Sequence, residues 1–169
     1  MGHEKKVLRN VINALKSGGY DAAVVRYEGS GDSGQVEEIA IYKPGEEPQS
    51  DCYYHFEGLS DKEERAAHAA RTAFLSDTQI EITVATSRFD HDKKEWIESS
   101  EDQMVPLLRG LDWLAYHWLR LGHPGWETDE GSYGHVILRV DQMQMEMEYH
   151  ERIVEVKCYS RKFSLGEEE

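Results

Sequence analysis

Two groups of acidic residues lie beside glycines and could carry chemistry. Asp32 and Glu37 belong to the run GSGDSGQVE, and Glu127 and Glu130 belong to the run GWETDEGSYG. Glycine allows backbone conformations that point several neighbouring carboxylates toward one place. Clustered carboxylate oxygens suit hard divalent cations, or they raise the pKa of one carboxyl group for acid–base work. These four residues are therefore the predicted ligands of a Mg²⁺, Mn²⁺ or Ca²⁺ ion.

A shared site requires that the two runs meet in space. If the first hairpin and the last strands belong to one sheet, the runs meet near Glu148. The predicted shared site then consists of Asp32, Ser33, Glu37, Trp126, Glu127, Glu130, His150 and Arg152. Asp32 and Glu127 could instead hydrogen-bond within their own turns, as Asp beside glycine commonly does, with the other carboxylates solvated. No residue is assigned a catalytic role on these grounds.

Two further motifs resemble known sites but lack essential parts. The tetrapeptide GDSG around Ser33 matches the nucleophile of chymotrypsin-like serine proteases, yet Ser33 precedes His68, which is the reverse of that family's order. Asp90 and Glu101 match two positions of a calcium-binding EF-hand loop, but Glu95 stands where that loop needs glycine. Neither motif predicts a site.

Hydrophobic periodicity predicts three helices. Apolar residues recur at helical spacing over 4–17, a capping box at Ser60 opens a helix over 61–75, and a third helix covers 104–121. The third helix carries more apolar surface than one sheet covers, which indicates contact with another helix or with a second subunit.

The strands are predicted from alternating or β-branched runs. These runs cover 22–27, 35–43, 78–86, 135–140, 143–150 and 153–163. The first two form a hairpin with an elaborate loop, and the charged residues 88–102 are expected to form a loop. In the run 143–150, the alternation places Met143, Met145, Met147 and Tyr149 on the buried side. The expected fold is α+β, with an antiparallel sheet of about five or six strands and the helices packed on one face.

Length and composition narrow the function classes. The 169 residues suit a single domain over 1–166, with 44–102 as an embellishment and 167–169 as a frayed acidic tail. A net charge of -14 disfavours direct binding of nucleic acid, which repels acidic surfaces. The sequence contains no apolar run long enough for a membrane span, and a cytoplasmic location is expected. Cys52 and Cys158 are expected to be reduced, buried thiols.

The two glycine-rich motifs and the end of the last strand carry a family resemblance. They are GSGDSG with Glu37, then GWE followed by Glu130, Gly131 and Gly134, and finally the His-x-Arg that begins at His150. With these residues the chain resembles an uncharacterised bacterial and phage domain family of unknown function. Residues 44–102 lie outside the resemblance. It implies a bacterial, phage or mobile-element origin and supplies no reaction.

The expected function is a non-enzymatic protein-interaction or regulatory module, with a role in phage–host conflict. Its partner is expected to be a protein, and a homodimer through 104–121 is a further expectation. Two alternatives remain open. One is a divalent-metal-dependent hydrolase that uses the clustered carboxylates, and the other is an acidic mimic of nucleic acid that inhibits a basic partner.

Overall fold

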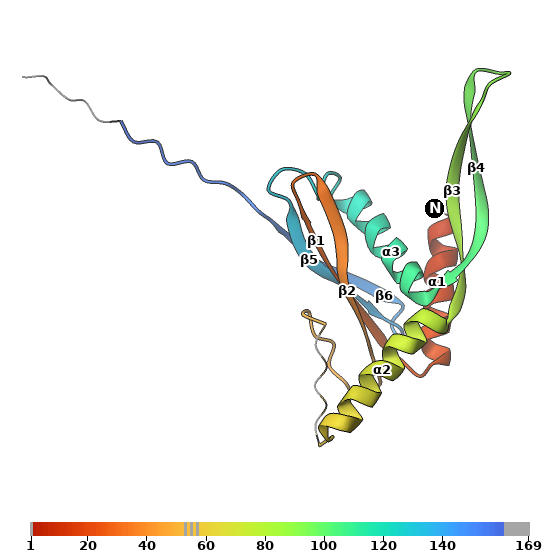
Figure 1. The fold of residues 1–169 in the computed structure, drawn as a ribbon, viewed down its shortest axis with the longest axis vertical. Helices are drawn as coiled ribbons and strands as arrows, with labels where there is room; N and C mark the ends of the chain where they lie inside the picture. The colour runs from red at the N-terminus through yellow and green to blue at the C-terminus, as the bar shows by residue number, and fades with distance from the viewer. Residues whose placement is uncertain (1, 53, 55, 57, 161–169) are drawn as a thin grey trace, which may run out of the picture.

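The computed structural model describes residues 2–52, 54, 56 and 58–160. Its elements follow the chain in the order α1 (Gly2–Ser17), β1 (Ala22–Ser30), β2 (Ser33–Tyr42), α2 (Asp61–Asp77), β3 (Gln79–Asp90), β4 (Glu95–Pro106), α3 (Leu107–Gly122), β5 (Ser132–Arg139) and β6 (Gln144–Glu151). The strands form a four-stranded antiparallel sheet in the order β2-β1-β5-β6 and a separate pair, β3 and β4. The α+β class is confirmed, with the six strands divided between two sheets (Figure 1).

The main core lies between the four-stranded sheet and two helices, as expected. The apolar residues of α1 recur every three or four positions, and the buried ones are Val7, Val11, Ile12 and Leu15. The buried positions of α3 are Leu107, Gly110, Leu111, Leu114, Ala115 and Leu119. Both helices pack against the side of the sheet that carries Ala23, Val25 and Tyr27 of β1.

The opposite side of the sheet is covered in part by the chain that follows β2. Ala22 and Val24 of β1 pack there with Tyr42, Cys52 and Tyr54. Because both of its sides are covered, β1 is a fully buried central strand over its first half. Burial raises the pKa of the Cys52 thiol to about 12, so this cysteine is a packed, unreactive side chain.

The first hairpin has a tighter connection than the sequence predicted. The strands β1 and β2 continue through the serines of GSGDSG and leave only Gly31 and Asp32 as the turn. Both residues have positive φ, 59° and 65°, which is the conformation of a two-residue type I′ hairpin. The glycine-rich run is therefore mostly strand rather than an elaborate loop.

The prediction of a loop over 88–102 is wrong. These residues form the outer part of a twelve-residue by twelve-residue hairpin of β3 and β4, which projects away from the four-stranded sheet (Figure 1). The outer half exposes both of its sides, so it lacks the alternation of apolar and polar residues that marks a half-buried strand. Its inner end packs on α1, and Leu107 N–H donates to Thr78 O where the hairpin joins α3.

Three predictions about the C-terminal third need correction. The run 153–163 is not a strand in its described part, because residues 152–160 have no regular secondary structure. Cys158 is exposed rather than buried. Met143 is 62% exposed in the turn before β6, whereas Met145, Met147 and Tyr149 pack against the core as expected. The predicted acidic tail, 167–169, lies outside the described residues.

None of the described helices is both long enough and apolar enough to cross a lipid bilayer.

Candidate functional site

The structure brings the two glycine-rich motifs into direct contact. Gly31 N–H at the hairpin turn donates to Asp129 O in the second motif, at 3.0 Å. Trp126 lies between them, only 3% exposed, with its ring edge-on to Tyr27 at a centroid distance of 5.6 Å. Two turns separated by almost a hundred residues therefore form one junction, which we call the motif junction and define as residues 29–34 with 125–131.

Glycines are needed at the motif junction because side chains and backbone approach too closely for a Cβ. A Cβ at Gly34 would overlap the indole ring of Trp126, and one at Gly29 would lie 2.9 Å from both that ring and the Glu127 backbone. Gly131 has a φ of 71°, and a Cβ there would overlap the Gly29 carbonyl. The spacing of glycines that drew attention in the sequence is thus a packing requirement.

The predicted carboxylate ligands lie mainly on the outer surface of this junction. Asp32, Glu37 and Glu130 are exposed, and Glu37 accepts a hydrogen bond from Gln35 Nε2 at 2.7 Å. Ser33 is also exposed, and its Oγ donates to Ser30 O at 3.2 Å within the same turn. Among the described residues, no three His, Cys, Asp or Glu side chains gather closely enough to hold a metal ion.

Glu127 differs from the other three carboxylates. Its side chain is half-buried, and its Oε2 is buried with no hydrogen-bond partner in the described part of the chain. Trp126 O, one residue earlier, accepts a 2.8 Å hydrogen bond from the buried Ser132 hydroxyl. The junction therefore positions this turn mainly through its backbone.

His150 and Arg152 lie in a pocket of about 290 Å³ next to the motif junction, on the sheet face opposite the two core helices. We call it the sheet-face pocket. It is lined by Arg26, Tyr27, Glu28, Ser50, Asp51, Tyr133, Gly134, His135, Glu148, His150 and Arg152. The strand register explains this composition, since His135 is paired with Arg26 on one side and with Glu148 on the other.

Ionic pairs connect the side chains of the sheet-face pocket. Glu148 lies between two imidazoles, with Oε1 2.5 Å from His150 Nε2 and Oε2 3.9 Å from His135 Nε2. The hydrogen bond with His150, followed by the charge of His135, lowers the pKa of Glu148. The Tyr133 ring stacks on the His150 ring at a centroid distance of 4.8 Å. The Arg152 guanidinium lies over the same Tyr133 ring, 4.9 Å from its centroid.

Arg152 joins the pocket to the motif junction. Its Nη2 donates to Glu28 at 2.6 Å, its Nη1 donates to Gly29 O at 3.0 Å, and its backbone N–H donates to Gly131 O at 3.0 Å. The sequence identified His150 and Arg152 but did not assign His135 and Tyr133 to the site. The strand register with Glu148 and His150 reveals both, and a single sequence does not specify that register.

The chemistry of the sheet-face pocket suits recognition of polar groups. Basic and acidic side chains are present together, and Glu148 and Glu28 are already paired with His135, His150 and Arg152 of the same lining. Such a surface complements a partner of mixed charge rather than a bare row of phosphates. The described lining offers an imidazole and a carboxylate for proton transfer, but no activated nucleophile is hydrogen-bonded to either.

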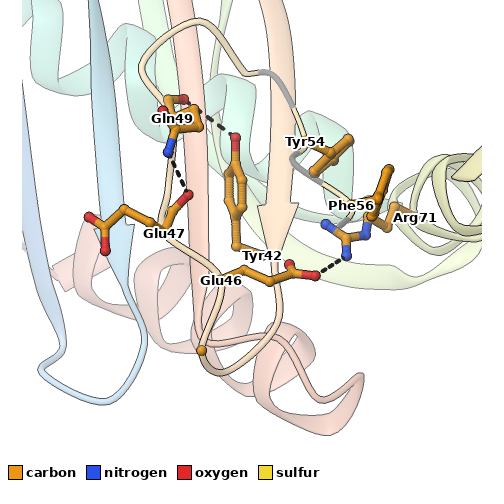
Figure 2. Close-up of a pocket in the computed structure, with 8 residues that line it drawn as sticks. Tyr42, Glu46, Glu47, Gln49, Tyr54, Phe56 and Arg71 are labelled. Carbon is orange, nitrogen blue, oxygen red and sulfur yellow. Dashed lines mark hydrogen bonds and ion pairs between the residues drawn. The ribbon is translucent and has the colours of Figure 1, made fainter. Parts of the chain in front are cut away.

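A second pocket, of about 450 Å³, surrounds Arg71 of α2 (Figure 2). The Arg71 side chain is only 4% exposed, and its guanidinium lies 4.4 Å from the Tyr54 ring centroid and 5.1 Å from that of Phe56. Its Nη2 donates to Glu46 at 2.6 Å, as drawn in Figure 2, and its Nη1 donates to Ile41 O at 3.0 Å. Here the structure shows why a buried charge is tolerated, because Arg71 is paired and hydrogen-bonded.

The exposed segment after β6 is the third feature near the site. Residues 152–160 leave the sheet at Arg152 and extend away from it (Figure 1). Four large apolar side chains lie on this segment and are between 63% and 85% exposed: Ile153, Val154, Val156 and Tyr159. We call residues 152–160 the C-terminal segment.

The apolar surface of α3 is largely covered within the chain. The core, α1 and the β3–β4 hairpin cover most of it, while Leu108 and Leu121 remain 37% and 64% exposed. A homodimer through this helix stays a prediction.

A comparison with protein families identifies the chain's relatives. A model described as a family of unknown function, DUF6878, matches residues 53–163. This range contains the second glycine-rich motif and the His-x-Arg, but the GSGDSG motif lies outside it. It also contains α2 and the projecting hairpin, so the expectation that residues 44–102 lie outside the family resemblance is wrong for 53–102. No curated protein and no solved structure matches the chain. The match covers more than half of the residues, and the chain therefore belongs to this family of unknown function.

Proposed function

We propose that this protein is a non-enzymatic protein-interaction module that binds a protein partner through its C-terminal segment. The observation that carries this proposal is the exposure of four large apolar side chains on residues 153–159. Contiguous apolar surface of this kind marks interaction sites in soluble proteins.

Burial of the apolar side chains of residues 153–159 by a partner would stabilise a complex. Burying one Val, Ile or aromatic side chain completely stabilises a protein or complex by roughly 1.5–3 kcal/mol. Within the chain, residues 153–159 have no place in either hydrophobic cluster. A partner that covers them would gain this free energy, minus the cost of ordering the segment.

The root of the C-terminal segment is held firmly, which gives it a defined direction. Arg152 makes two hydrogen bonds to the motif junction, one from its side chain to Gly29 O and one from its backbone to Gly131 O, and a third from its side chain to the neighbouring Glu28. We infer that the motif junction and the sheet-face pocket serve to anchor the start of a binding segment. This role uses the tight glycine packing and requires no catalytic group.

The two other hypotheses have less support. The metal-dependent hydrolase requires clustered ligands, whereas Asp32 and Glu130 lie exposed on turns, Glu37 lies exposed on β2, and no three possible ligands gather among the described residues. Mimicry of nucleic acid rests on a net charge of -14 alone, which also serves solubility. The role in phage–host conflict remains an expectation from the family resemblance.

The test is retention of a protein partner by the immobilised full-length chain. A variant with Ile153→Ser, Val154→Ser and Val156→Ser removes the apolar surface, and Leu121→Ser is the matched control, because Leu121 is equally exposed on a different element. Retained proteins are identified, purified and titrated against each variant at low and at moderate salt.

We expect the parent and Leu121→Ser to bind the same partner with similar Kd and the triple variant to lose at least tenfold in affinity. A gap of 1.4 kcal/mol is a factor of ten, so loss of a single buried side chain already reaches this level. No partner at either salt concentration, or equal binding by the triple variant, would refute the proposed function.

A further inference from the structure

We infer that the partner of the C-terminal segment is a second copy of this chain, whose β6 edge it extends as an added strand. This inference rests on the proposed function and names its partner. It predicts that two copies pair through residues 144–160, with β6 of each copy beside the C-terminal segment of the other.

β6 is the open edge of the four-stranded sheet. Within the part of the chain that the structure describes, the only side chain hydrogen-bonded to its backbone is Tyr27, whose hydroxyl donates to Glu148 O at 2.9 Å. Tyr27 reaches this carbonyl over Gly134 of β5, so it occupies the inner side of β6. The outward N–H and C=O groups of β6 remain available to pair with another strand.

The C-terminal segment has the composition of a strand but no neighbouring strand among the described residues. Residues 153–156 read Ile-Val-Glu-Val, which favours strands, yet they adopt no regular structure in the single chain. The segment continues directly from β6, so no turn exists that would fold it back onto its own β6. An open edge and an unpaired strand in one continuous run can satisfy each other only across two chains.

A two-fold arrangement of two chains allows this pairing. Two antiparallel copies of residues 144–160, related by a two-fold axis near the junction of β6 and the segment, place each segment beside the other chain's β6. Such an interface is self-complementary and closed, so it makes a dimer and no filament. It would join two four-stranded sheets into one and remove both open edges.

Charge complementarity supports the same pairing. The edge strand is acidic, with Glu146, Glu148 and Glu151, whereas residues 152–160 carry Arg152 and Lys157 against Glu155, a net charge of +1. Arg152 is paired with Glu28 of its own chain, so Lys157 is the cation that faces the partner's strand. Antiparallel pairing about the two-fold axis sets the basic segment beside the acidic strand, and opposite charges across a ladder stabilise it. The partner's segment would also lie along the rim of the sheet-face pocket at Glu148 and His150, which adds a wall to that pocket.

The test is sedimentation of the purified full-length chain over a range of concentrations. We expect a dimer of twice the 19.5 kDa chain mass that dissociates on dilution. The variant Glu155→Pro with Val156→Pro changes two successive positions, so at least one lost N–H faces the partner strand. We expect this variant to remain monomeric, with Kd raised at least tenfold.

Two controls separate pairing from other effects. Glu155→Ala with Val156→Ala keeps both N–H groups and should still form the dimer. Leu121→Ser disrupts exposed apolar surface on α3 and should leave Kd unchanged. Hydrogen exchange of residues 153–157 in the dimer provides a second readout, because pairing should slow these amides at least tenfold.

Each outcome decides the inference. A monomer at every concentration, or a dimer with the same Kd in the double-proline variant, overturns self-pairing. A dimer lost in Leu121→Ser but kept in the double-proline variant overturns it in favour of the α3 face. Retention of a different protein by the C-terminal segment is measured separately, so self-pairing can fail while the proposed function stands.

Discussion

The two edges of the four-stranded sheet are treated in opposite ways. At the β2 edge, Tyr54 Oη accepts from Ile41 N–H at 3.1 Å, and Arg71 donates to Ile41 O. Further along, Tyr116 Oη accepts from Val36 N–H at 3.1 Å. At the β6 edge, the described residues make only one side-chain hydrogen bond to the backbone, from Tyr27 on the inner side, and the strand runs on into an exposed apolar segment.

The difference between the β2 and β6 edges indicates which edge is open to pairing with another strand. An edge strand with free N–H and C=O groups is a template for pairing, and natural proteins cover edges that must stay single. The chain uses a buried arginine and two tyrosines to cover one edge. The edge strand β6 continues into the C-terminal segment, and this favours our proposal that β6 is the interaction surface.

The largest expected effect comes from removing the charged cover of the β2 edge. Arg71→Ala leaves Ile41 O without its donor and Glu46 without its ion-pair partner, so the free energy of unfolding should fall by about 2–4 kcal/mol. Chemical denaturation measures this loss. In Arg71→Lys, which keeps the charge but loses the guanidinium's several N–H donors, the free energy of unfolding should fall by less.

Ordinary surface substitutions change the free energy of unfolding by about 0.5 kcal/mol or less. If Arg71→Ala changes it by no more than this, Arg71 does not stabilise the β2 edge, and the proposed difference between the two edges is wrong.

A smaller effect should follow loss of the tyrosine hydroxyls at the same edge. Tyr54→Phe keeps the ring that packs on Arg71 and removes the hydroxyl that accepts from Ile41 N–H, which should cost about 1 kcal/mol. Hydrogen exchange should speed up at Ile41 and not at Val36. Tyr116→Phe is the matched control and should give the reverse pattern. Equal exchange at both amides in the two variants would show that the hydroxyls do not cover the edge.

Changes in the C-terminal segment should leave the stability of the monomer unaltered. Glu155→Pro with Val156→Pro alters residues outside both hydrophobic clusters, so unfolding at high dilution should shift by less than about 0.5 kcal/mol. The same denaturation experiment used for Arg71 checks this. A loss of 2 kcal/mol or more at high dilution would mean that the segment already packs within its own chain.

The smallest expected effect is on the pKa of Glu148, which lies on β6 next to His150 and His135. Because the hydrogen bond with His150 lowers the folded-state pKa of Glu148, its contribution to stability is present above the unfolded pKa and is lost as pH falls through the folded pKa. NMR titration should therefore give Glu148 a pKa below that of an ordinary glutamate. His150→Gln should raise this pKa, and His135→Gln should raise it less. An unchanged pKa in His150→Gln would assign the shift to another cause.

Much of the fold could be predicted from local pattern. The spacing of Val7, Val11 and Leu15 specifies α1, the Ser60 capping box starts α2, and period-two alternation places Met145 and Met147 on the core side of β6. These signals arise from burial on one side of an element, so they are visible in sequence.

The errors occurred where one-sided burial is absent. The outer β3–β4 hairpin exposes both sides, so its charged residues look like a loop. The run after Arg152 has strand-like composition, but a strand also needs a neighbour, which the single chain does not supply. The cover of Ile41 depends on Arg71, thirty residues away, and no local pattern encodes that contact.

The candidate site was predictable in part for the same reason. The glycine runs signalled close approach of backbone, and the structure shows Trp126 filling the space that Gly29 and Gly34 leave. Which carboxylates would lie near one another depended on strand register. That register places Glu148 between His135 and His150 and leaves Asp32 and Glu130 at the surface.

Hydrogen exchange of the full-length chain at two concentrations tests the central claim most directly, because it reports both edges of the sheet in one experiment. The account predicts that amides of residues 153–157 and of the β6 edge exchange more slowly in the concentrated sample, while Val36 and Ile41 exchange equally in both. Uniform exchange at 153–157, or slower exchange confined to β2, would contradict it.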